Sequence, residues 1–322
     1  MLRSFCAGLL LLLTALPARA EWQLHEQAIM GTRCAVELWE PDAVRARLLA
    51  QQVFAEMQRI DRLMSTYKPE SELSQLNARA ALAPVQVSQE LFDLIAAALE
   101  YARLSDGAFD ITYASVGYLY DYRQHQRPDA AARAAALPGV NFRHVELDPV
   151  NRTIHYTRSG TRIDLGGIAK GYVVDRAIEV LRASGVTRAM VNAGGDTRIM
   201  GDRFGKSWVV GIRDPNDAGR AALRVPLSDA AISTSGDYER YFDEGGVRYH
   251  HILDPRTGDS ARSLRSATVI GSTATRTDVL STTVFVMGAE RGLAMINRLG
   301  DVDAIVVTPE GKVLYSDGLQ PP

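Results

Sequence analysis

Helical and strand-like segments follow one another irregularly along the chain, and this order restricts the fold more than any other feature. The longest helical pattern begins at Pro41-Asp42 and continues to about Met64. Its apolar residues recur at steps of three, four and five, so we expect one face to enter a core. They are Val44, Leu48, Val53, Met57, Ile60 and Met64. Because regular βαβ alternation is absent, the sequence predicts an α+β fold of mixed sheets and packed helices rather than a doubly wound sheet.

The other predicted elements support the same class. Ser88 can cap the start of a second helix, which has one apolar face and ends at Gly107. That face consists of Leu91, Ile95, Leu99 and Ala102. Strands are expected at 33–39, 189–191, 208–212, 230–233, 247–253 and 267–270, hairpins around 148–151 and 309–311, and helices over 275–287 and 289–299. Residues 121–139 are expected to form a surface loop, which is the one candidate for an internal domain boundary. We expect the mature chain to form one functional unit.

The N-terminus has the pattern of a cleaved export signal. Arg3 supplies a positive charge, Phe5 to Leu16 form an apolar run, and Ala18-Arg19-Ala20 fits the small-x-small cleavage rule. The run is shorter than the ~20 residues that span a bilayer, which disfavours a transmembrane anchor. Glu21 follows the cleavage point, where a lipid-anchored protein would have Cys. The prediction is a signal peptide over 1–20 and a soluble, exported, periplasmic chain over 21–322.

Composition excludes several classes of function. The formal charge is −2, with 36 basic and 38 acidic residues. The chain therefore has no excess of positive charge to attract nucleic acid. Three Trp on a mixed surface argue against a protein of the membrane surface. Of two cysteines, Cys6 leaves with the signal peptide, and Cys34 follows a Met30-Gly31-Thr32 turn in an apolar stretch. We expect Cys34 to be a buried structural thiol.

The densest motif is Asp164-Leu165-Gly166-Gly167-Ile168-Ala169-Lys170-Gly171-Tyr172, read as a strand that ends at Asp164 and leads through two glycines into a helix closed by Gly185. Free N–H groups and the positive end of a helix dipole suit phosphate, and Lys170 adds a cation. The spacing of a P-loop is absent. A glycine-rich turn at an ordinary helix explains the motif equally well. A second glycine pair, in Asn192-Ala193-Gly194-Gly195-Asp196, also indicates either ligand contact or a tight turn.

Two further segments carry candidate chemistry. Asp278 and Thr282 are four residues apart, so on a helix they share a face and offer oxygen ligands to a hard cation. An exposed Asp–Thr pair is the alternative. In Tyr249-His250-His251-Ile252-Leu253, a His at a strand end could accept a proton from a hydroxyl. Adjacent strand residues point to opposite faces, so we do not expect both histidines to bind one zinc ion.

Taken in order, these segments resemble the FAD:protein FMN transferases, the ApbE-type flavin transferases. The resemblance covers nearly all of the mature chain and rests on nine segments in register. They are Met30–Thr32, Ser65–Tyr67, Ser71–Asn77, Gly107–Thr112, Asp164–Tyr172, Asn192–Asp196, Ser233–Arg240, His251–Gly258 and Asp278–Thr282. The resemblance implies a T-fold-related α+β unit. It also implies Mg2+-dependent transfer of FMN from FAD to a threonine hydroxyl, with a phosphoester product and AMP as leaving group.

The resemblance also assigns roles by position. The implied FAD contacts are Met30, Tyr67, Ala108, Phe109, Asp110, Asp164, Lys170 and Ile252. Asp278 and Thr282 match the side-chain metal ligands, Gly167 matches a ligand through its backbone carbonyl, and His251 matches the general base. Ser281 stands where some members have an acidic ligand, so whether it joins the metal site stays open. The implied acceptors are flavoprotein subunits of membrane electron-transport complexes.

Two alternatives remain at this point. A metal-dependent FAD pyrophosphatase would use the same site with water as the nucleophile, and the aromatic Tyr67 favours transfer over hydrolysis. A non-catalytic flavin-binding protein that supports maturation of a respiratory reductase would not need Asp278, Thr282 and His251, all of which are present. Many family members are exported lipoproteins, and this chain lacks their lipid-bearing Cys.

Overall fold

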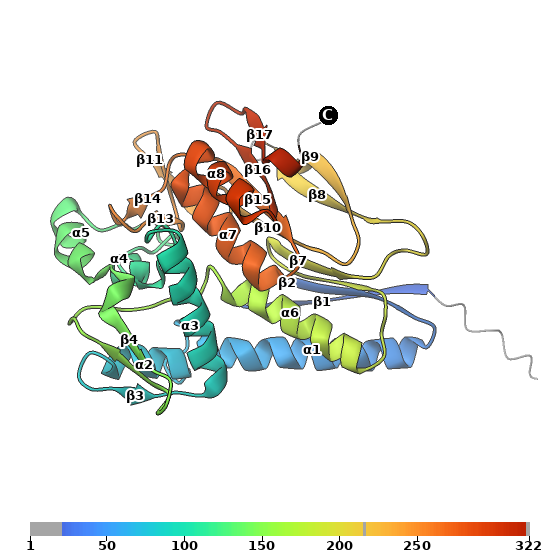
Figure 1. Ribbon diagram of the computed structural model, residues 1–322, viewed down its shortest axis with the longest axis horizontal. Helices are drawn as coiled ribbons and strands as arrows, with labels where there is room; N and C mark the ends of the chain where they lie inside the picture. Colours follow the sequence, from blue (N-terminus) through green and yellow to red (C-terminus); the bar gives the residue numbers. More distant parts are fainter. Residues whose placement is uncertain (1–20, 215–216, 320–322) are drawn as a thin grey trace, which may run out of the picture.

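The computed structural model describes residues 21–214 and 217–319, so the predicted signal peptide lies outside the described residues. Its centre is one eight-stranded antiparallel sheet in the order β1-β2-β6-β7-β10-β15-β16-β17 (Figure 1). The strands are β1 (Glu21–Ile29), β2 (Thr32–Glu40), β6 (Ala189–Ala193), β7 (Asp196–Met200), β10 (Ala231–Gly236), β15 (Ser266–Gly271), β16 (Asp303–Val307) and β17 (Val313–Tyr315). The predicted α+β class is confirmed.

Four helices cover one face of this sheet (Figure 1). They are α1 (Ala43–Met64), α6 (Ala169–Ala183), α7 (Ala274–Met287) and α8 (Ala289–Leu299). The hairpin of β8 (Trp208–Asp214) and β9 (Asp217–Leu227) packs on the other face, where Trp208 contributes to a cluster with Ile199 and Ile232. No helix in the described part of the chain combines the length and the apolar character needed to cross a bilayer.

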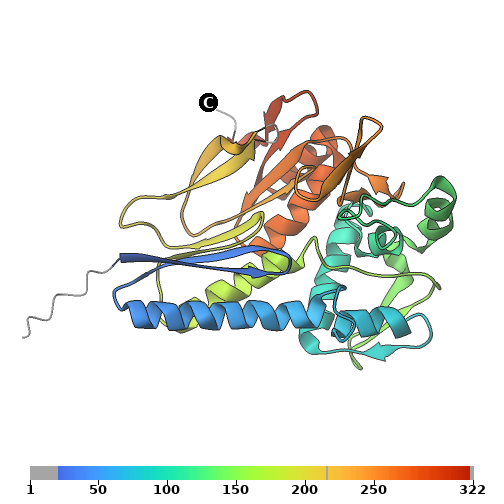
Figure 2. The same cartoon turned by 180° about the vertical axis from the view of Figure 1, so that it is seen from behind.

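A smaller group of elements lies at the C-terminal end of α1, as both views show (Figures 1 and 2). It contains α2 (Glu72–Arg79), α3 (Gln89–Leu104), η1 (Ile111–Tyr113), α4 (Ala114–Gly117), α5 (Ala130–Ala136), η2 (Leu137–Gly139), η3 (Phe142–His144) and the sheet β3 (Val85–Gln86), β5 (Thr153–Tyr156), β4 (Val145–Asp148). One hydrophobic cluster joins it to the main sheet, since Leu91 and Ile95 belong to the same core as Val36 and Val173. Burial of that shared surface stabilises both parts together.

Most predicted elements occur where they were expected. Ser88 caps α3 by accepting a hydrogen bond from Leu91 N, and the four predicted face residues of that helix are buried. Gly107 adopts φ +77° just after the helix, a conformation that favours glycine. The predicted hairpins form between β4 and β5 and between β16 and β17. Strand β1 was not predicted.

The predicted apolar stripe of α1 is wrong in its first turns. Val44 and Leu48 are 66% and 54% exposed. The side chains that enter the core there are Ala46, Leu49 and Ala50, followed by the predicted Val53, Met57, Ile60 and Met64. A step of five residues from Leu48 to Val53 rotates ~140° around a helix with 3.6 residues per turn, so the two cannot share a face.

Two predicted strands also differ in the structure. Asp164 does not end a strand, because residues 161–165 have no ladder partner; instead Asn77 holds Ile163 with hydrogen bonds to its N and O of 2.9 and 2.8 Å. The strand predicted over 247–253 is divided into β12 (Val247–His250) and β13 (Leu253–Asp254). β12 pairs with β11 (Tyr241–Glu244), whereas β13 pairs with β14 (Asp259–Ser260), and the break falls at His251-Ile252.

Cys34 is buried in β2, as predicted. Burial raises the pKa of its thiol to about 11, so the unreactive thiol form prevails near neutral pH. The residue therefore packs as a small apolar side chain.

Candidate active site

The loop before α6 is organised around the carboxylate of Asp164. Asp164 Oδ2 accepts a hydrogen bond of 2.8 Å from Thr66 Oγ1, and Oδ1 accepts bonds of 3.0 Å from Tyr113 OH and 2.7 Å from Gly166 N. Burial and the nearby Asp164 charge raise the pKa of Tyr113. Three elements that are far apart in the sequence are thus joined at the loop that leads into α6.

Gly167 lies where there is little room for a side chain. A Cβ there would come within 3.0 Å of Phe109 Cε2 and 3.5 Å of Thr282 Oγ1. Its backbone is therefore in close contact with the turn after α3 and with the middle of α7. Of the predicted site residues, Phe109, Gly167 and Thr282 meet at this point.

The next contact brings Asp278 to the first turn of α6. A Cβ on Gly171 would lie 2.2 Å from the Ala274 carbonyl oxygen and 2.8 Å from Asp278 Cβ, so only glycine permits this approach of α6 to α7. Asp278 Oδ2 accepts a hydrogen bond of 2.9 Å from Gly171 N. This bond satisfies one of the free N–H groups of the helix start.

Lys170 lies between two buried carboxylates. Its Nζ is 2.5 Å from Asp196 Oδ2 and 3.6 Å from Asp278 Oδ1. Burial lowers the pKa of Lys170, but the two carboxylate charges outweigh this effect and the net pKa is raised. Burial, followed by the charge of Asp196, raises the pKa of Asp278. Asp196 was quoted within a glycine motif but was not predicted as a site residue.

Hydroxyl groups from β10 line the facing side of α7. Ser235 Oγ lies 2.9 Å from Ser281 Oγ and 3.1 Å from Thr282 Oγ1. Ser281 Oγ also donates to the Asp278 carbonyl at 2.9 Å, so this hydroxyl is already engaged. Ser235 was missed by sequence reasoning. The two-residue period of β10 was the available indication, because Ser233, on the same face, contacts Thr277 of α7 at 2.8 Å.

The donors at this place fit a hard divalent cation. Asp278 supplies a carboxylate oxygen and Thr282 a hydroxyl, and the backbone of Gly167 lies next to Thr282. Among residues 21–214 and 217–319, no three His, Cys, Asp or Glu side chains are placed to hold a metal ion. Few side-chain ligands and oxygen donors are typical of Mg2+, which keeps waters and takes substrate phosphate.

The two adjacent histidines have different environments. His250 Nε2 lies 2.7 Å from the Ala261 carbonyl oxygen, and its Nδ1 accepts from Ile252 N at 3.3 Å, so both ring nitrogens are engaged. His251 Nδ1 is buried and has no hydrogen-bond partner within the described residues. Burial and then the positive charges of His250, Arg240 and Lys170 lower the pKa of His251 to about 3. His251 is therefore neutral near pH 7, with a ring nitrogen free to accept a proton, although so low a pKa makes it a weaker base than an ordinary histidine.

Two of the predicted flavin contacts lie in turns. Met30 and Gly31, with φ of 56° and 69°, form the two-residue turn between β1 and β2, as a type I′ hairpin requires. Gly194 of the β6–β7 turn lies against Thr32 of this hairpin. Tyr67 follows α1 and is 84% exposed, so its ring is free to stack on a flat ligand.

Two other predicted contacts have structural roles for their side chains. Asp110 is buried; its Oδ1 accepts from Thr112 N and its Oδ2 from Phe142 N, each at 2.8 Å. The Asp110 carboxylate is thus engaged within the protein. Ile252 packs in the core cluster beside α7.

The sequence of this site belongs to a known family pattern. Residues 30–306 match the model of the ApbE family. The chain belongs to the ApbE family. The matched range contains every predicted site residue, from Met30 to Thr282.

Known ApbE relatives match over most of their length. The chain is 33% identical to the FAD:protein FMN transferase of Treponema pallidum, with 94% of this chain and 89% of that protein covered. It is 32% identical to a FAD:protein FMN transferase of Klebsiella pneumoniae, with 91% of each covered. Among solved structures, the ApbE protein of Thermotoga maritima matches with a TM-score of 0.85 and 34% identity, covering 92% of this chain and 98% of that one. The flavin transferase ApbE of Vibrio cholerae matches with a TM-score of 0.82 and 30% identity over 92% and 98%.

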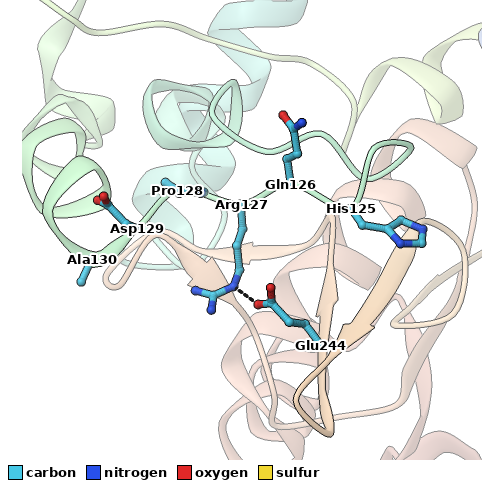
Figure 3. Close-up of a pocket in the computed structure, with 7 residues that line it drawn as sticks. All are labelled: His125, Gln126, Arg127, Pro128, Asp129, Ala130 and Glu244. Atoms are coloured by element: carbon cyan, nitrogen blue, oxygen red, sulfur yellow. Dashed lines mark hydrogen bonds and ion pairs between the residues drawn. The ribbon is translucent and has the colours of Figure 1, made fainter.

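This ApbE-family chain also has a surface cavity apart from the predicted residues. The cavity, of about 560 Å³, lies between residues 125–130 and Glu244 of β11 (Figure 3). Arg127 Nε donates to Glu244 Oε2 at 2.5 Å across it. None of the predicted site residues lines this cavity.

Proposed function

We propose that this ApbE-family enzyme is a FAD:protein FMN transferase that moves FMN from FAD to a threonine hydroxyl of an acceptor protein. The observation that carries the proposal is the meeting of Asp278 and Lys170 at the N-terminus of α6. A carboxylate for a metal and a cation for phosphate stand there at the positive end of the α6 helix dipole. This combination suits a dinucleotide diphosphate.

The proposed metal is Mg2+, held by Asp278, by the Thr282 hydroxyl and by the Gly167 carbonyl oxygen. When bound, Mg2+ would neutralise charge on the diphosphate of FAD as the bond to AMP breaks. Lys170 would contact the same diphosphate. Tyr67 would stack on the flavin ring, and the Met30 turn, the Ala108–Asp110 turn, Asp164 and Ile252 would complete the FAD site.

The proposed step is one displacement at phosphorus. The threonine oxygen of the acceptor forms a bond to the FMN-side phosphorus, and the bond from that phosphorus to the bridging oxygen breaks. The electron pair of the broken bond leaves with AMP. His251, whose ring is neutral and whose Nδ1 has no partner within the described residues, accepts the hydroxyl proton. No nucleophilic side chain of the enzyme is required, because the acceptor brings its own.

The proposal also includes a location and a partner class. Residues 1–20 would be removed as a signal peptide, and residues 21–322 would act as one catalytic unit in the periplasm, without a lipid anchor. The acceptors would be flavoprotein subunits of membrane electron-transport complexes.

The test uses residues 21–322 with FAD, Mg2+ and an acceptor protein that carries the target threonine. We expect a fluorescent flavin band on the acceptor in a denaturing gel and release of one AMP per flavin attached. An acceptor in which the target threonine is replaced by alanine should show no fluorescent flavin band. Release of AMP without flavin on the acceptor would instead identify a FAD pyrophosphatase. FAD that stays bound and intact with every divalent metal would identify a flavin-binding protein.

The metal assignment is tested by Asp278→Ala with a matched control. We expect this change to abolish metal-dependent AMP release while FAD binding weakens only in part. Asp254→Ala is the control, because Asp254 pairs with Arg256 beyond the His251-Ile252 break and has no proposed role. Metal-dependent AMP release at the wild-type rate in Asp278→Ala would remove Asp278 from the metal site.

A further inference from the structure

Asp196 is a buried carboxylate to which the proposed mechanism gives no role. It opens β7 directly after the Gly194-Gly195 turn, and it is 1% exposed. A buried carboxylate is costly unless a cation and hydrogen bonds compensate it. Its compensating cation is Lys170, at 2.5 Å. The pair is therefore weak evidence of a contribution to stability, since an apolar pair of similar size would avoid the cost.

The turn that carries Asp196 is rigid. Asn192 Nδ2 donates to the carbonyl oxygens of Gly194 at 3.0 Å and Asp196 at 3.1 Å. A Cβ on Gly195 would lie 2.6 Å from the Thr234 carbonyl oxygen, so the turn is pressed against β10. Asp196 thus presents its carboxylate from a fixed backbone position.

Lys170 has two anionic neighbours and is closer to one of them. Its Nζ is within hydrogen-bond distance of Asp196 Oδ2 but 3.6 Å from Asp278 Oδ1, beyond a normal hydrogen bond. Asp278 Oδ2 is occupied by Gly171 N. Oδ1 is therefore the Asp278 oxygen that an incoming cation can take, and Lys170 is the cation next to it.

We propose that Asp196 is a positioning residue that holds the Lys170 ammonium away from Asp278, so that Asp278 Oδ1 remains available to the divalent metal. This inference rests on the metal site of the proposed function. Without the Asp196 charge, Lys170 would have Asp278 as its remaining carboxylate neighbour among the ion pairs of the described residues. In a buried setting, opposite charges so close attract strongly, and the ammonium would compete with the metal for the same oxygen.

The first test measures metal binding without FAD and without turnover. Mn2+ binding to residues 21–322 is followed by electron paramagnetic resonance in wild type, Asp196→Asn and Asp278→Ala. We expect Asp196→Asn to weaken Mn2+ binding about tenfold, within the range of typical coupling between neighbouring sites. Asp196→Glu should restore much of the affinity, because it returns the charge. Wild-type Mn2+ affinity in Asp196→Asn would overturn the proposal.

A second variant separates competition from structural damage. Lys170→Met with Asp196→Asn removes the competing ammonium and the partner together, and it is compared with Lys170→Met alone. We expect Asp196→Asn to weaken Mn2+ binding much less when Lys170 is already Met than in wild type, whereas a merely structural role for Asp196 would give the same loss in both backgrounds. An equal loss in both backgrounds contradicts the inference.

The outcomes keep this inference distinct from the proposed function. If wild type binds Mn2+ no better than Asp278→Ala, the proposed metal site itself fails, and this inference fails with it. If Asp278 is required but Asp196→Asn binds Mn2+ normally, only the positioning role of Asp196 fails. Transfer of FMN to the acceptor by wild type is measured separately and does not enter this comparison.

Discussion

Asp175 of α6 caps the N-terminus of α7 through Thr275. Asp175 Oδ2 accepts hydrogen bonds from Thr275 N at 2.8 Å and Thr275 Oγ1 at 2.6 Å, while Oδ1 accepts from Ala274 N at 2.9 Å. Thr273, the local capping residue of α7, makes no side-chain cap bond. A side chain of α6 therefore accepts hydrogen bonds from the first N–H groups of α7. This contact lies where α7 begins, four residues before Asp278.

Replacement of this cap should affect stability and metal binding together. Asp175→Ala leaves two N–H groups of α7 without their acceptor, so we expect a loss of about 1–2 kcal/mol in unfolding free energy. Because α7 carries Asp278, Mn2+ binding should weaken too. Asp129→Ala is the control, since Asp129 caps the exposed helix α5. Urea unfolding and Mn2+ titration measure both effects. Equal effects of the two variants on Mn2+ binding would contradict the coupling.

Gly171 should tolerate no side chain. In Gly171→Ala the new Cβ meets the Ala274 carbonyl at 2.2 Å, and backbone cannot move aside as a side chain can. We expect a loss of about 3 kcal/mol or more. Gly245→Ala is the control: its φ is +58° but no atom lies within 4 Å of the added Cβ, so about 1 kcal/mol is expected. Calorimetry gives both values, and a smaller loss at Gly171 than at Gly245 would refute the packing argument.

Tyr67 should matter for ligand binding and not for folding. Its ring is 84% exposed, so Tyr67→Ala should leave the melting temperature unchanged while FAD affinity falls by about tenfold. Tyr118→Ala is the matched control, because Tyr118 is also exposed and lies under the guanidinium of Arg162. Quenching of FAD fluorescence measures affinity. Unchanged affinity in Tyr67→Ala would exclude stacking on this ring.

His250 should make the fold sensitive to acid. Burial lowers the pKa of His250 to about 4, below the ~6.5 of an unfolded chain. The unfolded state then binds the proton first, so stability is full above pH ~6.5 and falls towards pH ~4, by about 3 kcal/mol at most. His250→Gln should reduce this dependence by the part that His250 contributes and leave the part from His251, whose pKa is lowered to about 3. His125→Gln, at an exposed site, should keep the whole dependence. Urea midpoints between pH 4.5 and 8 test the sign, and parallel wild-type and His250→Gln curves would disprove it.

Local periodicity accounts for the part of the site that could be predicted. Asp278 and Thr282 share a face because both belong to one helix, and the two glycines before Lys170 indicated the helix start. The α1 stripe shows where such reasoning fails: Leu48 and Val53 are both apolar, yet a five-residue step separates their faces. Apolar character alone does not say which residues point inward when several registers are possible.

Contacts between distant segments could not be predicted in this way. Nothing within Asn192–Asp196 indicates that its carboxylate meets Lys170, and nothing near Asp175 indicates a helix cap almost 100 residues further along. These side chains meet because α6 packs closely against α7 and because the order of strands in the sheet brings β7 next to both helices. Ser235 is an intermediate case. Its spacing from Ser233 predicts that the two share a face of a strand, but it does not predict which helix that face contacts.

The sequence by itself determined the class of fold, most helix and strand positions and the resemblance that led to the ApbE family, because these depend on short-range periodicity and on motif order. The tertiary structure alone decided which carboxylate holds Lys170, which residue caps α7 and how far the pKa of His251 is lowered. Charge, burial and hydrogen bonding at those residues come from neighbours that only the packed chain brings together.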